Sequence, residues 1–302
     1  MTSIVPVSDY RKENFGKLVE LFSCHFQAGD KLLSQEYTEW LYLRNPHGTA
    51  KIVVVDDDGR WTGFMAMIPI RLISDGEQVV CYYVVNVLVH PEHQGKFLFG
   101  KMVAEAKRYI AVGNSVICGH PNALAIKTWR RSKMSFMPEL RPYIFLPWLN
   151  RGGYTAHEVR SGSQLNELTA ISTPYANQEN SVSQLVDRDY VQWRFFDHPH
   201  IQYRIQLLRH MGQPVGLVIS RHIKLQISLL IDIFVPSVHL RAGIRVLPVG
   251  TVAFMSESSD GLPPCTALAF PGKKRIPFFF SYEGGPDFTG KRVSIGLSAS
   301  DF

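Results

Sequence analysis

The sequence lacks the features of several large protein classes. No apolar run in its 302 residues approaches the roughly 20 that a membrane-spanning helix needs, and charged residues interrupt the first segment, 1–26. The four cysteines have no close spacing, so the sequence indicates neither a disulfide framework nor a zinc site. These absences predict a soluble, cytoplasmic protein with reduced cysteines.

Motifs of several enzyme classes are also missing. The chain has no Walker phosphate loop, no His-Glu-x-x-His zinc pair, no Gly-x-Ser-x-Gly turn and no two-glycine dinucleotide fingerprint. His198 and His200 would share one face of a strand, but no third ligand lies near them in sequence. We therefore expect no metal.

The charge of the chain is mildly positive, with a net charge of +6 and a sequence pI near 9.1. This balance favours an anionic small ligand, such as a nucleotide or a phosphorylated sugar, over nucleic acid. Lys127, Arg130, Arg131 and Lys133 form the densest basic group, which is typical of a solvated helix face. We expect no nucleic-acid partner.

One sequence pattern occurs twice. Seven positions of the first half recur in the second at a constant offset of 153 residues (193 minus 40), six of them with identical residues. The positions Ser34, Tyr37, Trp40, Pro46, Ile52, Gly59 and Gly63 correspond to Asp187, Tyr190, Trp193, Pro199, Ile205, Gly212 and Gly216. Because the offset is about half of the chain, the pattern predicts two copies of one α/β unit.

Each copy has the pattern helix, strand, hairpin, strand. Ser34 and Asp187 are suited to cap a helix N-terminus, and the prolines that follow would end the helix. Strands are expected at 51–55 and 204–208, followed by turns at 57–59 and 210–212. The alternative is that the identities are coincidental matches around a common hairpin.

The segment 79–110 carries the strongest local signal. Its first part, 79–89, is apolar and β-branched, as in a central strand, with Asn86 as the one polar residue. A glycine-containing loop follows, and Leu98, Met102, Ala106 and Ile110 then recur at helical spacing. Free amides at such a helix start favour a pyrophosphate, although an ordinary strand-to-helix turn has the same pattern.

Residues 89–96, Val-His-Pro-Glu-His-Gln-Gly-Lys, resemble the acyl-coenzyme A (acyl-CoA) loop of GNAT-superfamily acyltransferases. Gly119-His-Pro-Asn122, with Trp129 seven residues later, is similar to the family's later strand and helix. The resemblance covers about residues 3–148. It is greatest to the tandem-repeat GNAT-like proteins of bacterial surface-polysaccharide loci.

The resemblance implies an α/β (α+β) fold of two tandem GNAT-like domains, each with a mixed, mostly antiparallel sheet flanked by helices. The first domain, with the acyl-CoA loop, is expected at 1–149. A polar linker with a short helix near 164–170 is expected at 150–186. The second domain, at 187–302, has no equivalent loop and is expected to be degenerate.

Acetyl-CoA or another acyl-CoA is implied as the co-substrate. Strand backbone would contact its pantetheine arm, and the loop would hold its phosphates. The implied binding residues are Val87, Leu88, Val89, Gln94, Gly95, Lys96, Phe97, Leu98, Phe99, Gly100, Lys101, Asn122 and Trp129.

The sequence departs from the family pattern at two places. Phe97 and Phe99 stand at small-residue positions of the loop, and we expect their rings to point into the core. Trp129 stands where many relatives carry a tyrosine that protonates the departing thiolate. An indole cannot supply that proton.

The candidate catalytic residues are Asn86, His90 and Tyr143. Asn86 stands where relatives often have a base, but an amide can only orient a water. His90 is of a residue type that titrates near neutral pH, and Tyr143 is a candidate acid. Further candidates for the base and the acid are His93, His120, Tyr82 and Tyr83.

Three functions follow from these observations. The first is an acyl-CoA-dependent N- or O-acyltransferase, with acetyl as the expected group and a small polar acceptor such as an amino or nucleotide-linked sugar of cell-envelope polysaccharide biosynthesis. The second is a non-catalytic module that binds acyl-CoA or a partner protein on a relict fold, which Trp129, Phe97 and Phe99 favour. The third is a Fem-type aminoacyl transferase, which would need a basic groove and a helical arm that the sequence lacks.

Overall fold

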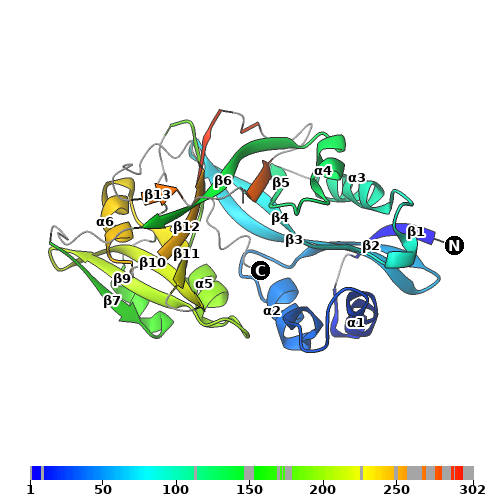
Figure 1. Cartoon of the computed structure of the whole chain (residues 1–302), viewed down its shortest axis with the longest axis horizontal. Helices are drawn as coiled ribbons and strands as arrows, with labels where there is room; N and C mark the ends of the chain where they lie inside the picture. Colours follow the sequence, from blue (N-terminus) through cyan, green and yellow to red (C-terminus); the bar gives the residue numbers. More distant parts are fainter. Residues whose placement is uncertain are drawn as a thin grey trace.

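The chain forms one mixed sheet flanked by helices in a computed structural model (Figure 1). The structure describes residues 2–7, 10–111, 114–145, 153–168, 171, 173, 179–224, 227–247, 251–256, 267–269, 276–280, 287–288 and 290–294. In this part of the chain, no helix combines the length and the apolar character that crossing a bilayer requires.

The first half of the chain forms six of the strands and four of the α-helices described. The strands are β1 (Thr2–Val7), β2 (Lys51–Asp57), β3 (Arg60–Ser74), β4 (Glu77–Val89), β5 (Ser115–Gly119) and β6 (Ser135–Phe145). The helices are α1 (Phe15–Ser23), α2 (Gln35–Leu43), α3 (Leu98–Ile110) and α4 (Ile126–Arg131), with short 3-10 turns η1 (Lys12–Asn14), η2 (Lys31–Leu33) and η3 (Pro91–His93).

The second half repeats much of this order. Its strands are β7 (Tyr154–Val159), β8 (Ser181–Gln184), β9 (Arg204–His210), β10 (Gln213–Lys224), β11 (Ile227–Phe234), β12 (Thr251–Ser256), β13 (Ala267–Ala269), β14 (Ile276–Phe280) and β15 (Arg292–Ser294). Its helical segments are η4 (Gly162–Glu167), α5 (Arg188–Val191), the π-turn η5 (Gln192–Phe196), η6 (Ser237–His239) and α6 (Leu240–Arg245).

The strand order of the sheet is nearly palindromic. Its path is β1-β2-β3-β4-β5-β14-β6-β12-β11-β10-β9-β7. Strands at equal distances from the two ends of this path are counterparts from the two halves. The pairs are β1 and β7, β2 and β9, β3 and β10, β4 and β11, β5 and β12, and β14 and β6. Each half therefore lends a strand to the other, because β14 pairs with β5 and β6 pairs with β12.

The segment 150–186, predicted as a polar linker, contributes β7, η4 and β8. β7 pairs antiparallel with β9, where Val159 opposes Ile205, as Val7 of β1 opposes Ile52 of β2. The short helix expected near 164–170 corresponds to η4. The sequence of β7 is polar because β7 is an edge strand, and most of its side chains are exposed or half-exposed. The domain boundaries at 149 and 187 stay predictions.

The helices cover both faces of the sheet in the first half. Figure 1 shows α1 and α2 on one face and α3 and α4 on the other. α3 buries the four residues whose spacing predicted it, Leu98, Met102, Ala106 and Ile110. On the face of α1 and α2, one apolar core contains residues of both halves, so the two copies fold against each other.

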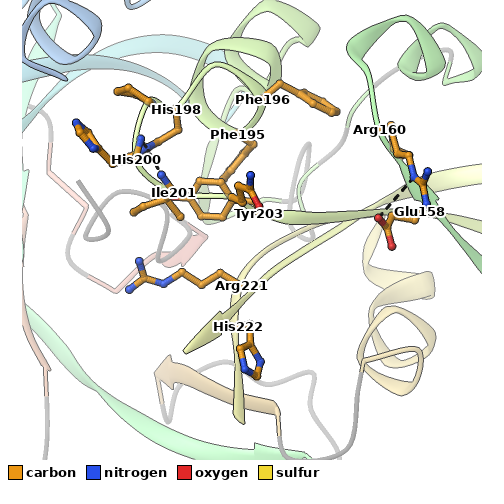
Figure 2. Close-up of a pocket in the computed structure, with 13 residues that line it drawn as sticks. Glu158, Arg160, Phe195, Phe196, His198, His200, Ile201, Tyr203, Arg221 and His222 are labelled. Atoms are coloured by element: carbon orange, nitrogen blue, oxygen red, sulfur yellow. Dashed lines mark hydrogen bonds and ion pairs between the residues drawn. The ribbon is translucent and has the colours of Figure 1, made fainter. Parts of the chain in front are cut away.

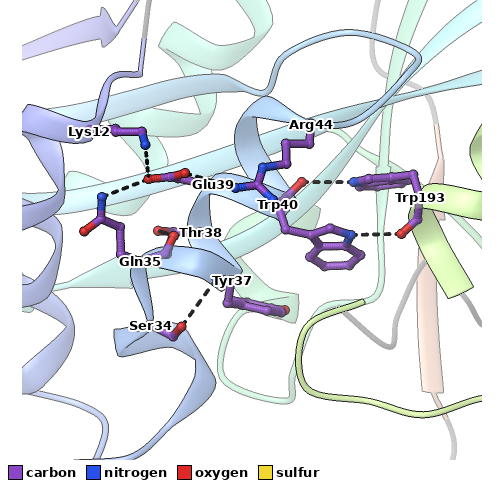
Figure 3. A network of polar contacts seen from close by, with 9 residues as sticks. All are labelled: Lys12, Ser34, Gln35, Tyr37, Thr38, Glu39, Trp40, Arg44 and Trp193. Carbon is purple, nitrogen blue, oxygen red and sulfur yellow. Dashed lines mark hydrogen bonds and ion pairs between the residues drawn. The ribbon is translucent and has the colours of Figure 1, made fainter. Parts of the chain in front are cut away.

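The repeated blocks meet at this shared core. The Ser34 hydroxyl accepts a hydrogen bond from the Tyr37 amide at 3.4 Å, and the Asp187 carboxylate accepts one from the Tyr190 amide at 2.7 Å, so both predicted caps are present. Nearby, the Glu39 carboxylate of α2 lies between three polar partners, Lys12, Gln35 and Arg44 (Figure 3). The Lys12 contact joins α2 to η1, and the other two partners lie in α2 or directly after it.

Candidate active site

Strand β4 is paired on both sides over only part of its length. It runs parallel to β5 from Val80 to Tyr83, and the last pair is Tyr83 with Cys118. Residues 84–89 continue to pair with β3 but have no partner on the β5 side among the described strands. Val87, Leu88 and Val89, which were predicted to bind the pantetheine arm, lie half-buried in this divergent segment.

A bulge in β4 places Asn86. The pairing with β3 changes register between Phe64 and Ala66, and Asn86 has a positive φ of 50°. Its amide nitrogen donates a hydrogen bond to the hydroxyl of Tyr42 on α2 at 2.9 Å. The bulge thus turns Asn86 toward α2, where its amide can hold a phenol or a water.

Tyr83 and His120 meet where β4 and β5 diverge. The Tyr83 hydroxyl lies 2.6 Å from Nδ1 of His120, whose ring stacks on Phe278 of β14 with centroids 4.7 Å apart. Burial raises the pKa of Tyr83 well above its ordinary value and lowers the pKa of His120 to about 3. Both groups are therefore neutral at physiological pH, and the hydrogen bond joins them in either tautomer of His120.

His90 lies at the far end of β4. Its backbone N–H donates to the Thr62 carbonyl at 2.8 Å, and its buried ring contacts the Glu92 amide and the Arg60 guanidinium, both at 3.3 Å. Seven residues separate His90 from Tyr83, which is on the order of 20 Å along a strand. His90 is thus not part of the Tyr83–His120 pair.

Tyr143 lies in β6, where its backbone pairs with Ala253 of β12. Its side chain is outside the part of the chain that the structure describes. The structure therefore brings no two of the three predicted catalytic residues, Asn86, His90 and Tyr143, into contact among the side chains described.

The loop 94–97 leads into α3 with its amides exposed. Gly95 and Phe97 both have a positive φ, 82° and 57°. The first helical hydrogen bond runs from the Lys101 N–H to the Phe97 carbonyl at 3.2 Å. Among the described residues, no hydrogen bond takes the N–H groups of residues 95–100, and no side chain caps α3. This row of donors at a helix N-terminus is suited to an anion.

Other predicted loop residues surround these amides. Gln94 directs its side-chain nitrogen toward the Val89 carbonyl at 3.5 Å, and His25 of α1 approaches the same carbonyl at 3.1 Å. Lys96 and Lys101 are exposed, so their positive charges add to the field of the helix terminus. Gly100 faces open space, because a Cβ added there would meet no atom within 4 Å.

The two loop phenylalanines differ in their surroundings. Phe99 packs edge-on against Trp129 with centroids 5.4 Å apart, as expected of a core residue. Phe97 is 78% exposed, so the prediction that both rings enter the core was wrong for Phe97. Its left-handed backbone is the cause, because it turns the side chain away from the helix face that Leu98 buries.

Asn122 and Trp129 hold α4 in place. The Asn122 side-chain oxygen accepts a hydrogen bond from the Ala125 amide at 2.9 Å, just before α4 begins. Trp129 is only 2% exposed and lies in the core between the sheet and α3. The structure thus gives both residues a role in positioning α4.

The sequence did not indicate Tyr42, His25 or Arg60. Each contacts a predicted residue across a large sequence separation, so no local pattern reveals it. Among the described residues, no group of three His, Cys, Asp or Glu side chains is placed to hold a metal ion.

Comparison with known proteins finds a family model that matches part of the chain. Residues 7–128 match the family model described as an acetyltransferase (GNAT) domain. No curated protein sequence matches the chain.

Several solved structures share the fold. A protein from Enterococcus faecalis, named as a probable N-acyltransferase, has a TM-score of 0.67 at 14% identity, over 93% of this chain and 73% of that one. A tandem GNAT protein from the clavulanic acid biosynthesis pathway has a TM-score of 0.55 at 12% identity, over 95% of this chain and 100% of that one. N-myristoyltransferase from Saccharomyces cerevisiae, solved with bound myristoyl-CoA, has a TM-score of 0.55 at 13% identity, over 94% of this chain and 80% of that one.

At these identities the structures show the fold alone. The predicted mixed α/β fold with a helix-flanked sheet is confirmed, and it extends over the length of a tandem GNAT protein. Residues 7–128 match the GNAT acetyltransferase domain model, and the fold of the chain is GNAT-like.

Proposed function

We propose that this protein is an acyl-CoA-dependent N- or O-acyltransferase that transfers an acetyl group to a small polar acceptor in the cytoplasm. An amino sugar or a nucleotide-linked sugar of cell-envelope polysaccharide biosynthesis is the proposed acceptor class. The GNAT match of residues 7–128 supports the reaction class. The acceptor rests on the resemblance to proteins of polysaccharide loci.

The observation that carries the proposal is the row of amides at 95–100. These N–H groups have no acceptor among the described residues, and they follow directly on the divergent end of β4. A pyrophosphate supplies the oxygens that such amides lack. Residues 94–101 would hold the phosphates of the co-substrate, and residues 87–89 its pantetheine arm.

The bound co-substrate supplies an activated acyl group as a thioester. The residues where β4 and β5 diverge would donate a proton to the leaving thiolate and orient the acceptor. The Tyr83 phenol carries a transferable proton, and its hydrogen bond with His120 fixes the position of its oxygen. With the ring hydrogen of His120 on Nδ1, the imidazole donates to the phenol oxygen, and the phenol hydrogen is then available to the departing thiolate. Asn86 can orient the acceptor or a water, because an amide has no proton to accept. We assign the donor role to Tyr83 because its phenol has an ionisable proton, whereas the indole of Trp129 is not an acid.

A charge substitution tests the cofactor assignment. Gly100→Glu adds a carboxylate beside the amides without a steric clash, since a Cβ at Gly100 meets nothing within 4 Å. A carboxylate is also tolerated in the first turn of a helix. We expect acetyl-CoA to bind at least about tenfold more weakly by calorimetry, a loss of about 1.4 kcal/mol.

Gly16→Glu is the matched control. Gly16 is the second residue of α1 and also faces open space, so the variant carries the same charge at another helix start. Its acetyl-CoA affinity should equal that of the wild type. Gly95→Trp, which fills the space beside the amides, should abolish binding; unchanged affinity in both loop variants would refute the site.

A non-catalytic acyl-CoA-binding module is the second candidate. The buried Trp129 favours it, because the position of the family's proton donor is filled by a core residue. This function predicts tight coenzyme A binding without turnover on any panel of amino and hydroxyl acceptors. Turnover with one acceptor would exclude it.

A further inference from the structure

The positive charge of the chain is concentrated in one segment. Residues 94–134, from the loop through α3 and β5 to α4, contain eight lysines and arginines and one acidic residue, Glu105, which gives a net charge of +7. The rest of the chain has 24 basic residues (32 minus 8) and 25 acidic residues (26 minus 1), a net charge of −1. Since α3 and α4 lie on the same face of the sheet, we name this basic region the α3–α4 surface (Figure 1).

Contacts between the two helices bring their cations together. The Lys107 ammonium, near the end of α3, donates to the backbone carbonyl of Ser132, directly after α4, at 2.5 Å. Near the start of α3, the ring of Phe99 packs edge-on against Trp129 of α4. The two helices therefore present one continuous surface.

Most of the charge is not neutralised within this surface. Its acidic residue, Glu105, pairs with Arg108 at 2.6 Å. Three exposed cations of α4 have no carboxylate partner among the described residues. They are Lys127, Arg130 and Arg131. An acidic partner would therefore be attracted to the α3–α4 surface.

The phosphates of a small co-substrate would cover only one end of the surface. The amides that would hold them belong to residues 95–100. Lys107 lies ten residues after Phe97, which is about 15 Å along a helix. At physiological ionic strength the field of an exposed charge falls off over about 8 Å. Phosphates at the loop would therefore do little to neutralise the cations at the far ends of the two helices.

Two large apolar side chains are exposed at the starts of the same helices. Phe97, before α3, is 78% exposed, and Leu124, before α4, is 91% exposed, the highest value among the large apolar residues described. Phe97 also keeps a left-handed backbone, which costs about 1 kcal/mol. Exposed apolar side chains within a charged rim are typical of a protein interface, and a small anion would use neither of them.

A carrier protein combines the required features. In acyl-CoA, the pantetheine arm ends in a phosphate that carries the nucleotide. When the same arm is attached through its phosphate to a protein, the phosphate can accept hydrogen bonds from the amides of residues 95–100, and the protein lies over the helices. An acidic protein surface complements the cations, and its apolar side chains can cover Phe97 and Leu124. An anionic membrane would match the charge alone, because it brings no thioester to β4.

We propose that the α3–α4 surface docks an acidic carrier protein that presents the acyl group on a phosphopantetheine arm. The inference rests on the proposed acyl transfer, for which it names a protein-bound donor in addition to acyl-CoA. The acceptor attacks the thioester carbonyl, and its bond to that carbon forms as the carbon–sulfur bond breaks. The thiolate of the arm takes the proton of Tyr83 and stays on the carrier, and the proton that the acceptor loses to water restores the phenol.

Calorimetry on the full chain with a holo acyl carrier protein of bacterial fatty acid synthesis tests the docking. This probe is acidic and has the phosphopantetheine arm. It should bind the wild type, and the apo carrier, without the arm, should bind at least tenfold more weakly. Lys127→Glu/Arg131→Glu reverses two exposed charges that lie on one face of α4, and it should weaken holo-carrier binding at least tenfold. Its acetyl-CoA affinity should be unchanged, which also shows that the variant is folded.

Arg11→Glu/Arg160→Glu is the matched control, because it makes the same change in net charge away from α3 and α4. The two side chains are 68% and 86% exposed. Each lies near one glutamate, and Figure 2 shows Arg160 beside Glu158. The holo-carrier affinity of this variant should equal that of the wild type. Phe97→Gly should weaken holo-carrier binding without loss of acetyl-CoA affinity.

The outcomes separate the docking from the reaction. A wild type that binds acetyl-CoA but not the holo carrier would overturn the docking alone, whereas one that binds neither would also refute the proposed function. Equal losses in the two double variants would show that net charge decides binding, and would overturn the proposal. Vesicles of anionic phospholipid are the alternative probe. Vesicle binding as tight as that of the holo carrier, and lost in Lys127→Glu/Arg131→Glu, would assign the surface to a membrane instead.

Discussion

Trp40 and Trp193 each donate the indole N–H to the backbone carbonyl of the other, at 2.9 and 3.0 Å. Their rings stack with centroids 5.0 Å apart and an interplanar angle of 22° (Figure 3). The two residues occupy the same position in the two copies, so the contact is reciprocal. Equivalent positions of the sequence repeat thus make equivalent contacts in the structure.

Removing either indole should weaken the junction between the halves. Trp40→Phe and Trp193→Phe each delete one buried hydrogen bond and leave a carbonyl without its donor, which costs about 1–3 kcal/mol. Urea unfolding should show similar losses for both and less than their sum for the double variant, because the residues are in contact. Trp61→Phe, within the first half, is the control for ring size; additive losses at 40 and 193 would contradict the coupling.

Phe97→Gly should stabilise the chain or leave it unchanged. Phe97 has a φ of +57° and an exposed ring, so glycine relieves about 1 kcal/mol of backbone strain at little packing cost. Glycine also restores the small residue of the family pattern, so acetyl-CoA affinity should not fall. Phe99→Ala is the contrast, because it removes the contact with Trp129 and should destabilise the chain, by less than the about 3–5 kcal/mol of a fully buried phenylalanine since the ring is half-buried. Thermal unfolding distinguishes the two.

Tyr83→Phe should reduce turnover and leave acyl-CoA affinity intact. The variant removes the only hydroxyl that we place at the divergence of β4 and β5 as a proton donor, and such groups contribute about 10² to 10⁴ in rate. Steady-state kinetics and calorimetry separate the two effects. Tyr82→Phe is the neighbouring control, because Tyr82 faces the core of α3. Equal kcat in wild type and Tyr83→Phe would exclude the assigned role.

His198 should make the chain less stable in acid. Its pKa in the folded state is about 3, below the ordinary value of 6.5, so the unfolded chain binds the proton first as the pH falls. The contribution of neutral His198 to the free energy of unfolding is complete above about pH 6.5. It is lost between about pH 6.5 and 3, by at most about 1.4 kcal/mol per pH unit. Urea unfolding at pH 7 and pH 5 should show a smaller loss for His198→Asn than for wild type. His157→Asn, on the exposed face of β7, should match the wild type.

Local patterns were sufficient where an element depends on its own residues. The spacing of Leu98, Met102, Ala106 and Ile110 predicted α3, and the equivalence of Ser34 and Asp187 predicted both helix caps. The offset of 153 also places His47 opposite His200 and Asn45 opposite His198, which a fuller reading of the repeat would have found.

Contacts between distant elements were not predictable in this way. The Tyr83–His120 pair depends on where β4 and β5 stop pairing, and the Asn86–Tyr42 bond depends on a bulge. The role of 154–159 as an edge strand was hidden because its mostly exposed side chains resemble those of a linker. Sequence position alone does not encode such long-range register.

The amino-acid sequence by itself determined the duplication, the fold class and the loop whose amides open α3, because caps, turns and apolar periodicity are properties of neighbouring residues. Only the tertiary structure decided that the two copies exchange β6 and β14 into one sheet and that Trp40 meets Trp193. It also decided that Asn45 donates to a strand carbonyl, whereas Nε2 of its counterpart His198 is buried without a hydrogen-bond partner among the described residues. Those outcomes follow from packing between segments more than 100 residues apart or from the small differences between the two copies, and no local pattern of residues records them.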